Sequence, residues 1–168
     1  MHIEFEKLLT ADALEELRKV AFQVWPQTFK SILSQEQIEY MMLMMYAPEV
    51  LQKELTGGMT FELIKIDGTP SGYVAYSIYP DQPETLKLHK VYLLKSFHSL
   101  GIGQKMLDHV QKQCRELGCK NILLTVNKHN ERAIRAYKRN GFVITRSAYT
   151  PIGHGFFMDD YIMEKCIK

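Results

Sequence analysis

The chain has few cysteines for its length. Its 168 residues include only Cys114, Cys119 and Cys166. The number is odd, and no spacing matches a zinc-binding pair or a CxxC redox motif. This pattern predicts neither a disulfide scaffold nor a bound metal, and we expect a reduced, cytoplasmic protein.

Long apolar runs and a strong excess of one charge are also missing. No apolar stretch reaches the roughly 18 residues that a membrane span requires. We also expect no signal peptide, because charge lies within residues 2–6. Lys and Arg together number 21 against 19 for Asp and Glu, which is unlike the basic surface of a nucleic-acid-binding protein. We therefore expect neither a membrane nor a nucleic acid as a partner.

What remains is the composition of an ordinary globular protein. Apolar residues make up 46% and charged residues 24% of the chain, which argues against disorder. The length is within the usual range for one domain, and no linker, repeat or low-complexity stretch interrupts it. The sequence therefore predicts a single domain over residues 1–168.

The first half of the chain predicts helices followed by a β-hairpin. Thr10 and Ser34 are suitable N-caps, and Gln37 completes a capping-box pattern after Ser34. Asp67 and Gly68 form a two-residue hairpin signal. We expect a strand at 2–5, helices at 10–20, 34–46 and 48–57, and strands at 60–66 and 72–79.

The second half predicts alternating strands and helices. We expect strands at 85–94, 121–126, 142–149 and 155–167, with helices at 101–117 and 130–139. The first strand–helix–strand unit should be a right-handed parallel crossover and the other pairs antiparallel, so the sheet is mixed. The continuous apolar run at 121–126 is typical of a strand buried on both faces. The expected buried side of the helix at 101–117 carries Ile102, Met106, Leu107, Val110, Cys114 and Leu117.

A glycine loop, His98–Gly103, lies between a strand and a helix. Two glycines let the backbone approach a ligand closely, and the amides from Leu100 to Gln104 point at one spot, where the helix dipole adds positive potential. Such a site suits a pyrophosphate. A dinucleotide fingerprint would need glycine where Met106 stands, and a Walker loop would need Gly-Lys-Ser/Thr. Taken alone, the loop fits a plain helix start equally well.

Together with a second motif, this loop resembles the GNAT superfamily of acetyl-CoA-dependent N-acetyltransferases. That family has a strand, then Gln/Arg-x-x-Gly-x-Gly/Ala, then a helix, and about 30 residues later Asn-x-x-Ala-x-x-x-Tyr-x-x-x-Gly-Phe. The matching residues here are Val91-Tyr92-Leu93, His98–Gly103, Asn130, Ala133, Tyr137, Gly141 and Phe142. The strongest match covers residues 86–142, and one departure is His98 in place of Arg or Gln.

The resemblance implies a fold and a cosubstrate. The expected fold is an α/β (α+β) domain with a mixed sheet of about seven strands, whose parallel central pair splays to hold CoA, and four to five helices. The implied activity is direct transfer of an acetyl group from acetyl-CoA to a primary amine in a ternary complex. The implied cofactor-binding residues are Tyr92, Leu93, Leu94, His98, Ser99, Leu100, Gly101, Ile102, Gly103, Gln104, Asn130, Ala133 and Tyr137.

The resemblance also assigns two catalytic roles. A backbone N–H at the end of the strand, at Leu93 or a neighbour, would bind the oxyanion, and Tyr137 would protonate the departing thiolate. Asn130 would cap its helix and contact the cofactor. The base stays open between His89, an acidic residue and water. Asp159 and Asp160 are adjacent on a strand and so point to opposite faces, which rules out a two-carboxylate mechanism.

The acceptor is less well defined. The region around Trp25, residues 34–47 and the tail at 158–161 resemble the polyamine-acetylating branch, so a small-molecule amine is the expected partner. One of Asp159, Asp160, Glu36, Glu39 and Glu54 would then bind a cationic amine. The superfamily also suggests a homodimer. Two alternatives are a non-catalytic acyl-CoA-binding or sensing domain and an acetyltransferase for protein lysines or N-termini.

Overall fold

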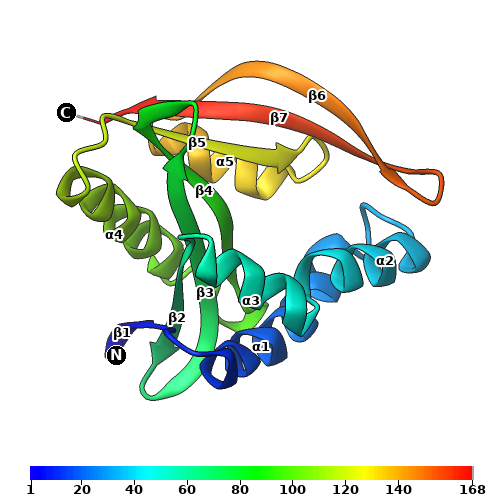
Figure 1. Cartoon of the computed structure of the whole chain (residues 1–168), viewed down its shortest axis with the longest axis horizontal. Helices are drawn as coiled ribbons and strands as arrows, with labels where there is room; N and C mark the ends of the chain where they lie inside the picture. Colours follow the sequence, from blue (N-terminus) through cyan, green and yellow to red (C-terminus); the bar gives the residue numbers. More distant parts are fainter. Residues whose placement is uncertain (168) are drawn as a thin grey trace. The chain divides into compact units, whose positions relative to one another are not determined.

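A computed structural model describes residues 1–167 (Figure 1). Within them the chain forms seven strands and five α-helices. None of these helices is long and apolar enough to cross a membrane. In chain order the elements are β1 (Ile3–Lys7), α1 (Ala11–Phe29), α2 (Gln35–Tyr46), α3 (Pro48–Thr56), β2 (Thr60–Ile66), β3 (Thr69–Tyr79), β4 (Gln82–Leu93), a 3₁₀ turn η1 (Lys95–Phe97), α4 (Ile102–Glu116), β5 (Asn121–Asn127), α5 (Glu131–Arg139), β6 (Val143–Gly153) and β7 (Phe156–Cys166).

The strands form one mixed sheet in the order β1-β2-β3-β4-β5-β7-β6. β4 and β5 pair in parallel, with Leu86 opposite Ile122 and Leu88 opposite Leu124. The pairs β1–β2, β2–β3, β5–β7 and β6–β7 are antiparallel. The expected mixed sheet with a parallel central pair is thus confirmed.

The chain divides into two compact units. The first comprises residues 1–77 and 90–103, and the second comprises residues 78–89 and 104–167. The first unit holds β1, β2, most of β3, the end of β4 and helices α1–α3. Its largest fully buried side chains are Trp25, Tyr46, Tyr73, Tyr76 and Phe61. In the second unit, the buried side chains of α4 and β5 include Met106, Val110, Cys114, Ile122 and Leu124.

Local capping signals place three helices where the sequence predicts them. The Thr10 hydroxyl accepts from the Ala13 amide, and the Ser34 hydroxyl accepts from the Gln37 amide, both at 3.1 Å. The Asn130 side chain accepts from the Ala133 amide at 3.4 Å. Each bond satisfies one of the amides that a helix start leaves unpaired, which explains why these starts are correct.

Three details differ from expectation. α1 continues to Phe29, well past residue 20 and through Pro26, because Trp25 and Phe29 extend its buried face. Leu117 was expected on the buried side of α4 but is 47% exposed, since the helix ends at Glu116 and the chain then turns. Thr125 is exposed, so β5 is not buried on both faces along its whole length.

Candidate active site

The glycine loop opens α4 as expected. Ser99 and Gly101 both have left-handed backbone angles, with φ of 66° and 77°. A Cβ added to Gly101 or Gly103 would meet no atom within 4 Å, so the backbone of the loop is open there. The first amides of an α-helix have no intrahelical partner, and the first turn of α4 carries no acidic side chain. This local structure fits an anion such as a pyrophosphate.

The end of β4 is held closely by β3. A Cβ on Gly72 would lie 2.6 Å from the Tyr92 carbonyl oxygen and 3.3 Å from the Leu93 Cα, so only glycine fits. The Leu94 amide donates to the Ser71 carbonyl at 2.9 Å. The backbone around Leu93, the predicted oxyanion donor, is therefore fixed by its neighbour strand.

Gly72→Ala should disturb this arrangement. The added methyl group must push the backbone of Tyr92 and Leu93 away, and we expect kcat to fall about tenfold, because oxyanion donors act only in a narrow geometry. Steady-state kinetics with acetyl-CoA and an active amine measure this effect. Gly57→Ala is the control, since its Cβ would meet its nearest atom at 3.1 Å at the end of α3. Equal kcat in both variants would contradict the close-approach argument.

His98 also contacts the end of β4. Its Nε2 lies 3.0 Å from the Leu93 carbonyl oxygen. Because a carbonyl only accepts, the ring nitrogen carries the proton and donates. The residue that departs from the family pattern therefore anchors the strand end beside the glycine loop, a role that the sequence alone does not reveal.

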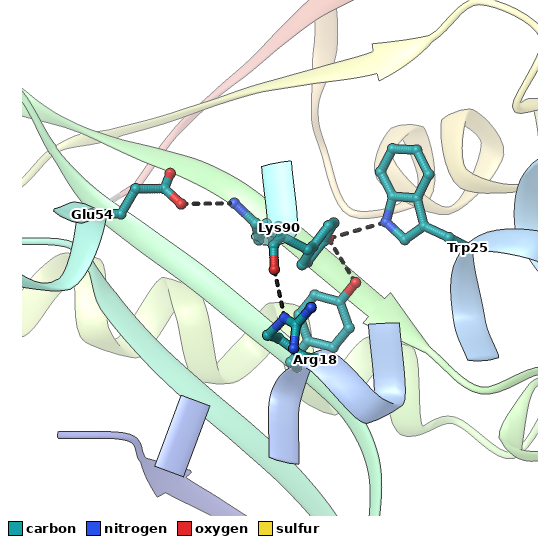
Figure 2. A network of polar contacts seen from close by, with 6 residues as sticks. Arg18, Trp25, Glu54 and Lys90 are labelled. Carbon is teal, nitrogen blue, oxygen red and sulfur yellow. Dashed lines mark hydrogen bonds and ion pairs between the residues drawn. The ribbon is translucent and has the colours of Figure 1, made fainter. Parts of the chain in front are cut away.

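An aromatic cluster supports Tyr92 in the first unit. The Tyr92 ring lies 5.9 Å from the Trp25 ring and 5.5 Å from the Tyr73 ring. Trp25 Nε1 donates to the Tyr46 hydroxyl at 3.0 Å, and the Tyr46 and Tyr73 hydroxyls are 2.7 Å apart (Figure 2). Burial raises the pKa of both tyrosines, so their hydroxyls stay protonated and serve as structural hydrogen-bond groups.

A buried ion pair lies next to this cluster. Lys90 is 4% exposed, and its Nζ is 3.7 Å from Glu54 Oε1 (Figure 2). The same Nζ lies 5.4 Å from the centre of the Tyr46 ring, a cation–π distance. Glu54 was one candidate for binding a cationic amine. Its carboxylate already faces a buried cation, which weakens that assignment.

Tyr137 belongs to the second unit. It lies on α5, is 8% exposed, and its ring packs edge-on against Phe142 at 5.8 Å. Burial raises its pKa. Within residues 1–167 its hydroxyl has no hydrogen-bond partner. The group is thus protonated and available, as a proton donor must be.

The two carboxylates of β7 have different surroundings. Asp159 is paired with Lys128, with Oδ1 and Nζ 3.1 Å apart. Asp160 is 8% exposed and stands opposite Asn127 of β5. The pKa of Asp160 is raised to about 6: burial is the largest cause, the Asp159 charge raises the pKa as well, and Lys128 partly offsets both. The sequence offered both acids as candidates for binding an amine and did not distinguish them, because burial in the middle of a sheet depends on strands distant in the chain.

The expected site residues fall into two groups. The first unit contains Tyr92, Leu93, Leu94 and residues 98–103. The second unit contains Gln104, Asn130, Ala133 and Tyr137. Within the second unit, Gln104 Nε2 bonds to Asn140 Oδ1 and so joins α4 to the end of α5. His89 is half-buried on β4. Residues 1–167 contain no group of three or more His, Cys, Asp or Glu side chains placed to hold a metal.

Comparison with known proteins identifies the family. Residues 13–142 match the family model described as "Acetyltransferase (GNAT) family". The chain belongs to the GNAT family. It is therefore an N-acetyltransferase that uses acetyl-CoA, and its sheet and helix order are those of this fold.

Relatives of this GNAT chain include polyamine acetyltransferases. The spermidine N(1)-acetyltransferase of Thermoplasma acidophilum is 28% identical over 98% of each chain. The spermine/spermidine N(1)-acetyltransferase of Bacillus subtilis is 34% identical over 45% of this chain and 54% of that protein. The crystal structure of PaiA N-acetyltransferase from Thermoplasma acidophilum in complex with coenzyme A covers 99% of both chains, with a TM-score of 0.82 and 27% identity.

Proposed function

We propose that this GNAT enzyme acetylates a small primary amine, with polyamines such as spermidine as the leading acceptors. The observation that carries the proposal is the similarity to a spermidine N(1)-acetyltransferase over 98% of both chains. The acceptor attacks directly in a ternary complex, without an acyl-enzyme. Direct attack is supported by the cysteines, because Cys114 and Cys119 are buried and burial raises the pKa of both thiols, which makes them poor nucleophiles.

The chain supplies three functions around the thioester. Acetyl-CoA brings an activated acetyl group, and the amides at the start of α4 bind its pyrophosphate. The backbone N–H at Leu93 stabilises the negative charge that develops on the carbonyl oxygen, a contribution of about 3 kcal/mol. Tyr137 protonates the departing sulfur. Asn130, which caps α5, holds the helix that carries Tyr137.

We further propose that the two compact units work as one N-acetyltransferase domain, because the family match at residues 13–142 runs through both. A cytoplasmic location is supported by the cysteines. All three are free thiols, and two of them are buried. Free thiols are typical of reducing compartments.

Thiol release from acetyl-CoA tests the proposed acceptor. The panel holds spermidine, spermine, single amino acids, an aminoglycoside and a lysine peptide, and a chromogenic thiol reagent reports turnover. We expect spermidine or spermine to give the highest kcat/KM. Preferred turnover of the lysine peptide would instead establish a protein acetyltransferase. No thiol release with any amine, while acetyl-CoA still raises the Tm, would favour an acyl-CoA-binding domain.

A further inference from the structure

Two largely buried polar side chains of the second unit make no hydrogen bond with the other described residues. Asp160 and Tyr137 are each 8% exposed, and no hydrogen bond to either side chain occurs within residues 1–167. Neither side chain is among the fully enclosed polar atoms of the described residues, so the oxygens of both can be reached from solvent. A largely buried carboxylate that is still accessible and makes no hydrogen bond is a candidate for binding a ligand or moving a proton.

The register of β5 and β7 fixes the face on which Asp160 lies. Asp160 pairs with Asn127, and Ile162 pairs with Thr125. Because side chains alternate along a strand, these four side chains share one face of the sheet. Thr125 is exposed and Asn127 half-buried, so this face offers a polar patch beside the carboxylate.

The opposite face is covered by α4 and α5. It carries Ile122, Leu124 and Val126 on β5, which are all buried, and Lys165 on β7. Lys165 Nζ donates to Gln111 of α4 at 3.0 Å, and a Cβ on Gly141, which follows α5, would lie 3.4 Å from the same side chain. Tyr137 on α5 and Asp160 on β7 therefore belong to opposite faces of the sheet.

We propose that Asp160 is the catalytic base, which binds the acceptor nitrogen beside Thr125 and Asn127 and takes its proton. The inference rests on the proposed function and deepens it. An ammonium acceptor first loses one proton to solvent through Asp160. As the nitrogen bonds to the carbonyl carbon, its second proton passes to Asp160, the carbon–sulfur bond breaks, and the thiolate takes the Tyr137 proton. Solvent then returns a proton from Asp160 to Tyr137.

The placement of the acid and the base on opposite faces of the sheet fits their two separate proton transfers. The nitrogen attacks the carbonyl carbon from one side, and the sulfur leaves from another, so acid and base should not share one position. Asp160 approaches from the Thr125 face, and Tyr137 lies on the helix-covered face.

The charges around Asp160 leave it ionised but basic at neutral pH. On β5 it faces Asn127 and Thr125, which are uncharged, and on β6 it stands opposite Ala148, with Arg146 two residues away. On β7 the neighbouring Asp159 repels the charge of Asp160, and Glu164 lies on the same face of the sheet. Lys128, which comes directly after β5, attracts the charge of Asp160. Burial is the largest of these influences, and together they raise the pKa of Asp160 to about 6. A base with this pKa is matched to proton transfer near pH 7.

Asp160→Asn, with Asp159→Asn as the matched control, tests the proposal. The acceptor is the best amine of the panel, and kcat/KM is measured from pH 5 to pH 9. Asp160→Asn should lower kcat about tenfold to hundredfold and abolish the acidic limb near pH 6, while the Tm rise with acetyl-CoA persists. Asp159→Asn should keep kcat at pH 8 within about twofold. Its acidic limb should move to lower pH, because a repelling charge is gone.

Two further readouts separate catalysis from folding. The folded-state pKa of Asp160 lies above its ordinary value of 3.8, so ionisation destabilises the fold as pH rises from about 4 to 6. Asp160→Asn should therefore raise the Tm at pH 7.5, and this gain should vanish near pH 4. An acceptor of low basicity, such as methoxyamine, should lose less activity than the polyamine in this variant.

Two results would overturn the role of Asp160. One is kcat within twofold of wild type together with an unchanged acidic limb. The other is an equal loss in Asp159→Asn and Asp160→Asn, which would indicate a general effect of charge on β7. Both results require a wild-type enzyme that turns over an amine, so they leave the proposed function intact. A failure of the proposed function would appear earlier, in the panel.

Discussion

Tyr137→Phe should lower kcat by about 10²- to 10³-fold. General acids contribute about 10²- to 10⁴-fold, and a thiolate is a fair leaving group, since ordinary thiols have a pKa of about 8.5, so we expect the lower part of that range. Phenylalanine keeps the edge-on contact with Phe142 and removes only the hydroxyl. That hydroxyl has no hydrogen-bond partner within residues 1–167. Stability and acetyl-CoA binding should therefore be unchanged.

The measurement is kcat and KM for both substrates over pH 6 to 10, with the Tm in the presence and absence of acetyl-CoA. Because burial raises the pKa of Tyr137 above its ordinary value of 10.0, the wild-type enzyme should show no alkaline loss of activity from this group below about pH 10. Tyr149→Phe is the control, since Tyr149 is a 65% exposed tyrosine of the same unit. If Tyr137→Phe matches this control in kcat across the pH range, Tyr137 is not the acid.

The sequence predicts those parts of this protein that local chemistry determines. Ser34 caps α2 through Gln37, and Asn130 caps α5 through Ala133, in both cases by a hydrogen bond between residues three apart. The helix that begins at Pro48 ends before Gly57, as expected. The hairpin at Asp67 and Gly68 is another example, since both residues adopt positive φ. Helix boundaries and turns that depend on residues a few positions apart can be predicted without knowledge of the fold.

What the sequence does not predict depends on distant segments. Position 72 needs glycine because a Cβ there would lie only 2.6 Å from the Tyr92 carbonyl oxygen. The burial of Asp160, compared with its neighbour Asp159, comes from the position of β7 between β5 and β6. The hydrogen bond of His98 to Leu93 likewise requires the turn after β4. Each is visible only once the strands are placed.

The length of α1 has the same origin, and it bears on Trp25. A helix ending at residue 20 is the natural expectation when Pro26 follows, because proline removes one helical hydrogen bond. The helix nevertheless continues past Pro26, because burial of Trp25 and Phe29, which are 1% and 6% exposed, offsets the lost hydrogen bond. The Trp25 indole is therefore expected to be a major source of stability in the first unit.

Trp25→Ala should lower the free energy of unfolding by about 3 to 5 kcal/mol, the usual cost of deleting a fully buried large aromatic side chain. The variant loses ring contacts to Phe29, Tyr46 and Tyr92. It also loses the hydrogen bond from the indole to Tyr46. For a chain of this length, the change corresponds to a Tm lower by roughly 10 °C. Denaturant titration and thermal melts measure both quantities.

Phe22→Ala on the same helix is the matched control. Phe22 is 49% exposed, so its removal should change the free energy of unfolding by no more than about 0.5 kcal/mol. Because Trp25 supports Tyr92 next to Leu93, Trp25→Ala should also lower kcat at a temperature where the variant is still folded, whereas Phe22→Ala should not. Similar stability losses in both variants would show that the aromatic cluster does not hold α1 to the end of β4. A loss of stability in Trp25→Ala with unchanged kcat would show that the cluster supports the fold without positioning Leu93.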